Sequence, residues 1–120
     1  MLIQRGDIFL ATLDPTIGVE QAGTRPVLVV QCDLANERIS TVTIVPLTSN
    51  LRAGRFLFTV TVQAAETGLI GDSVVLAFHI RTLDKRRLLG KKGHLSAQTM
   101  TKVDAALLLH LGLPASFSTS

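Results

Sequence analysis

Short apolar runs rich in β-branched residues recur along this 120-residue chain, and turn residues separate them. Apolar runs of about four to eight residues between turn signals predict β-strands. None approaches the roughly 18 apolar residues needed to span a bilayer. Strands are therefore expected at roughly 6–13, 26–32, 40–48, 55–62 and 73–80.

One segment has the features of a helix instead. From Ala97 to Leu111, apolar side chains recur at helical spacing. Ser96 is a favoured N-cap residue, and Gly112 followed by Pro114 ends the helix. The apolar surface is wider than one stripe, which predicts packing on two sides or at a subunit contact. The expected fold class is mainly β with one C-terminal helix (α+β), in a small, partly closed SH3-like or OB-like barrel.

The chain is expected to form a single domain over residues 1–114, followed by a flexible tail over residues 115–120. Its N-terminus lacks the basic and apolar regions of a signal peptide. The single cysteine, Cys32, excludes an intramolecular disulfide and fits a reducing cytoplasm. Because Cys32 directly follows a predicted strand, it is expected to be a small buried hydrophobe rather than a nucleophile.

Positive charge is concentrated in the second half of the chain. The formal net charge is +3, and residues 51–120 carry nine basic groups against four acids. Six of those basic groups lie between Arg81 and Lys92. This imbalance indicates a polyanionic partner. A solvated basic turn is the alternative explanation.

Three polar clusters lie at the ends of expected strands, so a barrel could bring them together on one rim. The first joins Glu20 and Gln21 to Arg25, the second is Thr48-Ser49, and the third runs from Asp72-Ser73 to His79 and the basic segment. The three histidines are far apart in sequence, and no zinc, phosphate-loop or dinucleotide motif is present. No metal or other cofactor is therefore expected.

Five motifs occur in a characteristic order and approximate spacing. They are Arg5-Gly6-Asp7-Ile8, Gly18-x-Glu20-Gln21-x-Gly23-x-Arg25-Pro26, Pro46-Leu47-Thr48-Ser49, Asp72-Ser73-Val74 and Ile80-Arg81-Thr82-Leu83-Asp84-Lys85. Together they resemble the MazF/PemK family, the toxins of bacterial type II toxin–antitoxin pairs. The resemblance covers residues 2 to about 112.

The resemblance implies a homodimeric SH3-like barrel that cuts single-stranded RNA, including mRNA, at short specific sequences. It implies no metal, an antitoxin protein as partner and a cytoplasmic location. The family's two catalytic positions fall on Arg25 and Thr48. Substrate contacts are expected from Glu20, Gln21, Ser49, Ser73, His79, Arg81, Lys85 and Arg86. The chain has His79 where the family usually has Gln, and Phe78 where a polar residue is common, so the recognised RNA sequence stays open.

The residue types suit such a reaction. Arg25 offers a planar fork of donors for a phosphate, and Thr48 can donate a hydrogen bond to the same group. An arginine is a poor general base, so Arg25 is expected to stabilise charge and to donate a proton to the leaving oxygen. His79 is a candidate base, with a groove-lining or core histidine as the alternative.

Two other functions stay open at this stage. One is a non-enzymatic toxin of the same fold that binds DNA gyrase, and the other is an inactive nucleic-acid-binding barrel. The pairing of Arg25 with Thr48 favours the nuclease. The chain has no Trp or Tyr, which counts against a barrel that binds nucleic acid by stacking alone.

Overall fold

The computed structural model describes residues 1–13 and 23–114. Its strands are β1 (Asp7–Thr12), β2 (Thr24–Val29), β3 (Thr41–Thr48), β4 (Thr59–Val62), β5 (Ser73–Leu76), β6 (Arg81–Asp84) and β7 (Leu88–His94). Its α-helices are α1 (Asp33–Arg38), α2 (Ala64–Thr67) and α3 (Ala97–Leu111). Short 3₁₀ segments are η1 (Leu51–Arg55), η2 (Ala77–His79) and η3 (Lys85–Arg87).

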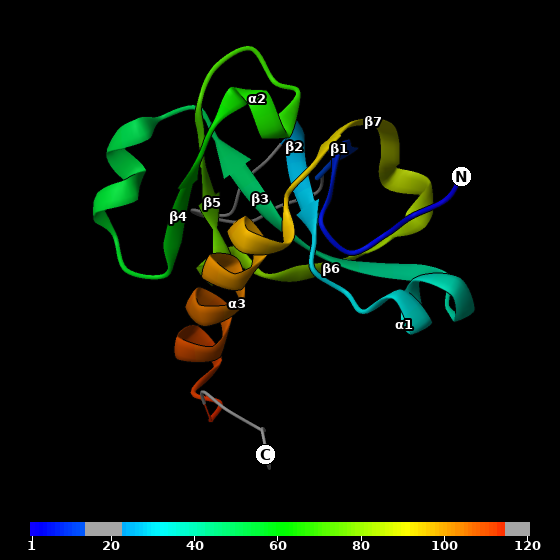
Figure 1. Cartoon of the computed structure of the whole chain (residues 1–120). Coiled ribbons are helices and arrows are strands. Elements are labelled where there is room, and N and C mark those ends of the chain that lie inside the picture. The colour runs from blue at the N-terminus through cyan, green and yellow to red at the C-terminus, as the bar shows by residue number, and fades with distance from the viewer. Residues whose placement is uncertain (14–22, 115–120) are drawn as a thin grey trace.

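The strands form one antiparallel sheet in the order β4-β5-β3-β2-β1-β7, and β6 pairs with β3 beside this path (Figure 1). The long strand β3 changes partners along its length. Thr41 pairs with Asp84 of β6, whereas Thr48 pairs with Val74 of β5. No ladder of the described residues joins β7 to β4, so the barrel is partly closed, as the sequence predicts.

Two buried apolar clusters stabilise this sheet. A single strand contributes to both clusters, because its successive side chains point to opposite faces. Ile8 belongs to the cluster that includes Met100 and Val103 of α3, whereas its neighbour Phe9 belongs to the other. Full burial of each such side chain stabilises the fold by about 1.5–3 kcal/mol relative to exposure. Strand β1 is therefore fixed from both faces.

Helix α3 is confirmed over the predicted residues. The Ser96 hydroxyl oxygen accepts a hydrogen bond from the Thr99 N–H at 3.1 Å, and Gly112 adopts the left-handed conformation at the other end. Only one side of the helix is buried, with Val103 and Leu107 among the buried residues. Leu109 on another side is 72% exposed. Among the described residues, nothing covers the second packing surface that the sequence predicts.

Several expectations on local structure are wrong. Residues 81–94 form β6, the turn η3 and β7, which raises the strand number from five to seven, and Lys85, Arg86 and Arg87 lie in that turn. The strand expected at 73–80 ends at Leu76, where η2 begins, and the strand expected at 55–62 begins at Thr59. The short helices α1 and α2 were not expected. Cys32 is exposed rather than buried, because it lies at the start of α1 beyond the end of β2.

The predicted tail, residues 115–120, lies outside the described residues, so the boundary of the domain at 114 stays a prediction. Within residues 1–13 and 23–114, no helix is long and apolar enough to cross a membrane.

Candidate functional site

A pocket of about 250 Å³ lies where β2, β3 and β5 end or begin. Three of the predicted site residues line it: Arg25 near the start of β2, Ser49 just after β3, and Ser73 at the start of β5. The turn before β5 supplies an apolar wall. The described residues that line it are Arg25, Pro26, Leu47, Ser49, Leu69, Ile70, Gly71 and Ser73.

Strand register explains why these residues meet. Thr48 pairs with Val74, and the same antiparallel register continued by one residue sets Ser49 opposite Ser73. Val27 pairs with Pro46 on the other side of β3. The ladder ends at that pair, and the same register extrapolated by two residues past Pro26 would set Arg25 opposite Thr48. The sheet therefore brings together residues from three separate parts of the chain at one edge.

Arg25 and Thr48 have the exposure that a binding site requires. Arg25 is exposed, and Thr48 is half-buried at the last position of β3. The Thr48 Oγ1 accepts a hydrogen bond from the Asn50 N–H at 3.2 Å. A hydroxyl that accepts this bond still carries a hydrogen to donate. Thr48 is not among the residues that line the pocket, whereas the hydroxyls of Ser49 and Ser73 are donors for a phosphate there. Among the described residues, no acidic side chain lines it.

Two of the predicted substrate contacts, Glu20 and Gln21, lie outside the described residues. Two others, His79 and Arg81, do not line the pocket. His79 ends η2, with its ring centroid 4.4 Å from that of Phe78. The Arg81 guanidinium donates to the carbonyl of Leu13 at 3.3 Å, and so fixes the chain just after β1. The roles of His79 and Arg81 in RNA binding stay predictions.

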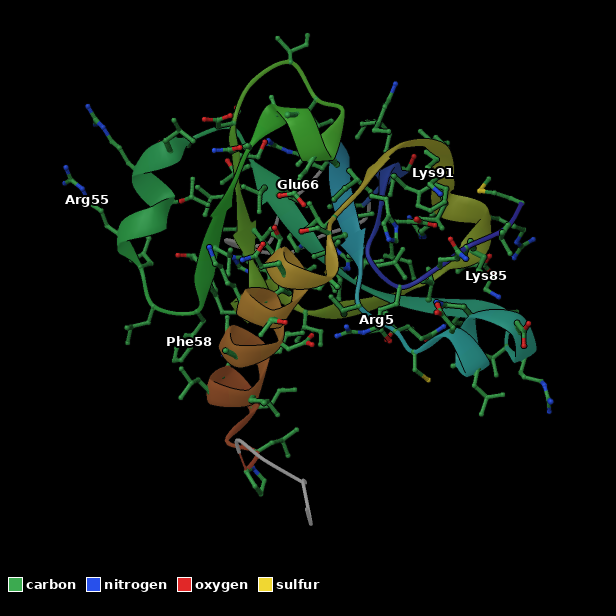
Figure 2. All side chains as sticks on the ribbon, viewed as in Figure 1. Arg5, Arg55, Phe58, Glu66, Lys85 and Lys91 are labelled. Atoms are coloured by element: carbon green, nitrogen blue, oxygen red, sulfur yellow. The ribbon has the colours of Figure 1, made fainter. Side chains whose placement is uncertain are left out.

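Lys85 and Arg86 lie at the opposite end of β3 from Thr48. They follow Asp84, which pairs with Thr41 at the start of β3. The seven residue steps from Thr41 to Thr48 span roughly 23 Å along the strand. Figure 2 shows Lys85 beside α1, where its ammonium donates to the carbonyl of Asn36. Their contribution to RNA binding also stays a prediction, and it would need a long groove.

Arg86 is engaged within its own turn. Its guanidinium forms two hydrogen bonds with the Asp84 carboxylate, at 3.0 and 2.9 Å. The Arg86 side chain and backbone N–H lower the pKa of Asp84 to about 2, and the carboxylate raises the pKa of Arg86. Because Arg86 is exposed, this pair contributes little to stability.

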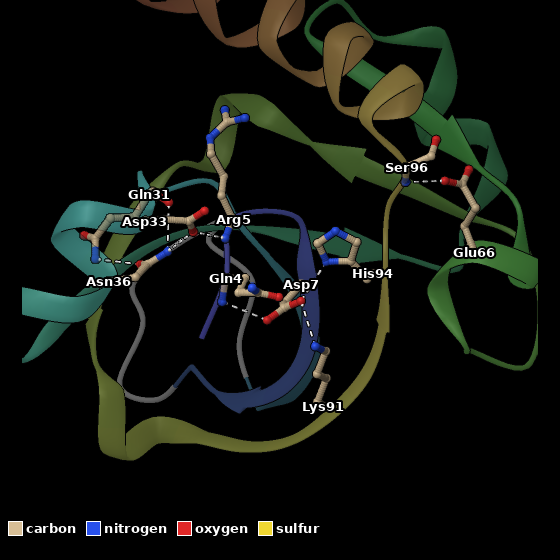
Figure 3. Close-up of polar contacts among 10 residues, drawn as sticks. All are labelled: Gln4, Arg5, Asp7, Gln31, Asp33, Asn36, Glu66, Lys91, His94 and Ser96. Atoms are coloured by element: carbon tan, nitrogen blue, oxygen red, sulfur yellow. Dashed lines mark hydrogen bonds and ion pairs between the residues drawn. The ribbon is translucent and has the colours of Figure 1, made fainter. Parts of the chain in front are cut away.

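Sequence reasoning missed a polar network centred on the fully buried carboxylate of Asp7, at the start of β1 (Figure 3). Asp7 Oδ1 lies 2.7 Å from His94 Nδ1 and 3.0 Å from Lys91 Nζ, and Oδ2 accepts the Gln4 N–H at 2.8 Å. Burial raises the pKa of Asp7, but the hydrogen bonds from His94, Gln4 and Lys91 outweigh it and lower the pKa below its ordinary value. The network ties β1 to β7.

The sequence contains a partial signal for this network, because an acidic residue begins an otherwise apolar strand. The partner His94 is 87 residues away, however, and nothing local indicates it. Among the described residues, no three His, Cys, Asp or Glu side chains are grouped so that they could hold a metal ion.

Comparison with known proteins gives one consistent result. The family described as "PemK-like, MazF-like toxin of type II toxin-antitoxin system" matches residues 4–111. The chain is 41% identical over 113 residues to Endoribonuclease EndoA of Bacillus subtilis (strain 168). The aligned residues cover 94% of this chain and 97% of that protein.

Solved structures agree with the sequence match. The fold resembles MazF of Deinococcus radiodurans with a TM-score of 0.80 and 32% identity, covering 94% of this chain and 99% of that one. It also resembles a mycobacterial endoribonuclease in complex with its cognate antitoxin, with a TM-score of 0.73 and 28% identity, covering 94% and 96%. A match along almost the whole length, in sequence and in fold, leads to one conclusion: the chain belongs to the family of PemK-like, MazF-like toxins of type II toxin–antitoxin systems.

Proposed function

We propose that this toxin is a sequence-specific endoribonuclease that cleaves single-stranded RNA, mRNA included, through attack by a ribose 2′-OH. The observation that carries the proposal is the pocket that joins Arg25 to the Ser49 and Ser73 hydroxyls beside Thr48. The similarity to an endoribonuclease that matches almost the whole chain supports it.

In this reaction the 2′-oxygen attacks the adjacent phosphorus and the bond from phosphorus to the 5′-oxygen breaks. The 2′-OH loses a proton and the leaving 5′-oxygen gains one, so the products are a 2′,3′-cyclic phosphate and a 5′-hydroxyl. Negative charge grows on the phosphoryl oxygens in the transition state, and donors aimed at those oxygens accelerate the step. Arg25 and Thr48 are the proposed catalytic residues: both donate hydrogen bonds to the phosphoryl oxygens, and Arg25 is also the proposed proton donor to the leaving oxygen.

The experiment that tests this function is cleavage of a long RNA by the purified protein in excess chelator. We expect cutting at a short recurring sequence, with cyclic phosphate and 5′-hydroxyl ends, because the proposed chemistry needs only side-chain donors. An RNA with a single 2′-deoxy nucleotide at the cut site should resist cleavage there. Loss of cutting on addition of chelator, or 5′-phosphate ends, would contradict the 2′-OH mechanism.

The proposed partners are the single-stranded RNA and a cognate antitoxin protein that neutralises the toxin. A mycobacterial relative of similar fold is seen with its cognate antitoxin, which supports the second partner. We place the activity in the cytoplasm, where RNA is found and where a single unpaired thiol suits the reducing conditions.

We also propose that the toxin is a homodimer. An apolar hollow of about 400 Å³ lies between η1–β4 and the end of α3, lined by Phe56, Leu57, Phe58, Phe78 and His110. Phe56 and Leu57 are 67% and 76% exposed, and Leu109 of α3 is exposed as well. Large exposed apolar surfaces of this kind mark interaction sites.

The backbone of the same surface is held in an unusual conformation. Phe58 has φ +64°, and its ring centroid lies 5.2 Å from that of His110. A left-handed, bulky residue costs about 1–3 kcal/mol and persists where its surroundings fix it. A twofold interface would cover this surface in both copies and set two equivalent pockets in one assembly.

Light scattering should therefore give the mass of two chains at micromolar concentration. Leu57→Asp is expected to shift this mass to one chain, because it buries a charge in the interface. Leu34→Asp, on the exposed face of α1, is the matched control and should remain dimeric. A dimer that survives Leu57→Asp would place the interface elsewhere, and a monomeric parent protein would contradict the dimer.

A further inference from the structure

The apolar wall of the candidate pocket comes from a turn that the proposed catalytic chemistry does not use. Leu69, Ile70 and Gly71 connect α2 to β5 and line the pocket with Arg25. Leu69 is half-buried and packs against the main apolar cluster, whereas Ile70 is fully exposed. Leu69 thus anchors the turn and Ile70 projects from it.

The turn is closed at its base by side-chain hydrogen bonds. Asp72 Oδ1 accepts the Ala64 N–H at 2.9 Å, which joins the two ends of the segment. The buried Thr67 accepts the Leu69 N–H on its hydroxyl at 3.1 Å. Glu66 accepts the Ser96 N–H at 2.7 Å and the Thr99 hydroxyl at 2.8 Å, which fastens α2 to the start of α3. The backbone before Ile70 is therefore fixed on several sides.

Close backbone contact with β7 fixes the turn further. A Cβ on Gly68 would lie 1.9 Å from the carbonyl oxygen of Lys92, and one on Gly93 would lie 2.4 Å from that of Thr67. Only glycine fits at either position, so α2 rests directly on the β7 backbone. An apolar side chain on a support as rigid as this loses little entropy when a ligand covers it.

Single exposed apolar residues are common on protein surfaces and need no ligand. Ile70 differs because it shares one pocket with Arg25, Ser49 and Ser73. The donors suit a phosphate and the wall suits an apolar surface. A nucleotide offers both a phosphate and an apolar surface, since its phosphate and the flat face of its base are carried on one ribose.

We propose that Ile70 is a specificity-determining residue that packs against one nucleobase next to the cleaved phosphate. This inference rests on the proposed ribonuclease function. Leu69 and Gly71 complete the surface: Leu69 is anchored in the core beside Ile70, and a Cβ added at Gly71 would meet no atom within 4 Å, so there is room for a base there. An apolar contact of this kind selects by the shape and stacking area of the base rather than by hydrogen bonds.

The test compares the parent protein with Ile70→Ser, Ile70→Leu and the control Leu34→Ser, on a short RNA that contains the mapped cut site. Ile70→Ser is expected to raise KM on the order of tenfold with kcat nearly unchanged, because it removes binding that the ground state and transition state share. Ile70→Leu should restore KM, and Leu34→Ser, exposed on α1 away from the pocket, should not change it.

A series of the same RNA with one abasic nucleotide at successive positions identifies the base. At one position next to the cut, base removal should raise the KM of the parent protein as much as Ile70→Ser does, with no further increase in the variant. Losses that add at every position, or an unchanged KM in Ile70→Ser, would overturn the inference. So would a variant whose only changes are its oligomeric mass or its affinity for antitoxin, because Ile70 would then belong to a protein interface.

These outcomes are separate from failure of the function itself. A parent protein that cuts no RNA in chelator contradicts the ribonuclease and this inference with it. A parent protein that cuts normally, beside an Ile70→Ser variant of unchanged KM and preference, contradicts the role of Ile70 alone.

Discussion

Arg25→Ala is expected to slow single-turnover RNA cleavage by about 100-fold to 1000-fold, a loss on the order of 3–4 kcal/mol in transition-state stabilisation. The substitution removes the guanidinium fork from the pocket beside Ser49 and Ser73. Arg25→Lys should recover only part of the rate, since a point charge does not reproduce bidentate contact. Arg38→Ala, a cation at the end of α1, is the matched control and should cleave normally.

Thr48→Val completes this experiment, because it keeps the shape of the side chain and deletes the hydroxyl. If Arg25 and Thr48 bind the same phosphoryl group, the double variant should lose less than the sum of the two single losses. Thermal melting of every variant should stay close to that of the parent, since Arg25 is exposed and Thr48 ends its strand. Near-normal rates in either single variant would remove that residue from the catalytic assignment.

Asp7→Asn is expected to lower the free energy of unfolding by about 1.5–3 kcal/mol at pH 7, because it removes the ionised acceptor of the hydrogen bonds from Gln4, Lys91 and His94. Asp104→Asn is the control. Asp104 pairs with Arg5 at the surface of α3, where an exposed pair contributes about 1 kcal/mol or less. Chemical denaturation of both variants beside the parent protein measures the difference.

The same comparison has a defined pH dependence. The pKa of Asp7 is lower in the folded protein than the ordinary value of 3.8, so its ionised form stabilises the fold. This contribution is complete above the unfolded pKa and is lost as the pH falls from about 3.8 through the lower folded pKa. The difference in stability between the parent and Asp7→Asn should therefore narrow as the pH falls through that range. A gap that stays constant in acid would show that the carboxylate charge is not what stabilises the network.

Helix α3 could be predicted to the residue because its signals are local: an N-cap at Ser96, apolar spacing along the helix and a glycine at Gly112. Strands β6 and β7 could not be predicted in the same way. Strand β7 is an edge strand, with Lys91 and Lys92 exposed and two glycines in its length. Its place in the sheet depends on backbone pairing with β1. Because that pairing does not require apolar side chains at alternate positions, the sequence of β7 does not show the pattern by which strands are recognised.

The candidate site likewise contains residues with a local sequence signal and a residue whose role depends on contacts elsewhere in the fold. Arg25, Ser49 and Ser73 could be predicted to lie together because each lies at a strand end within a recognisable motif, whereas Thr48 does not line the pocket and its role stays a prediction. The contribution of Ile70 depends on how the turn is held, by Asp72 at its base and by Gly68 against β7. The contact of Gly68 with β7 joins segments that are far apart in the chain, and a single sequence does not display it. Helices α1 and α2 are too short to produce a readable periodicity.

The exposed Cys32 has a practical consequence for studying this toxin. Cys32 lies beyond the end of β2, whereas Arg25 lies at the start of the same strand, so the thiol and the pocket are at opposite ends of it. It is also the only cysteine in the chain. A maleimide dye can therefore be attached to the unaltered protein at one defined place, away from the pocket. Energy transfer from that dye to a labelled RNA or antitoxin peptide would report binding directly, with no cysteine to introduce or remove.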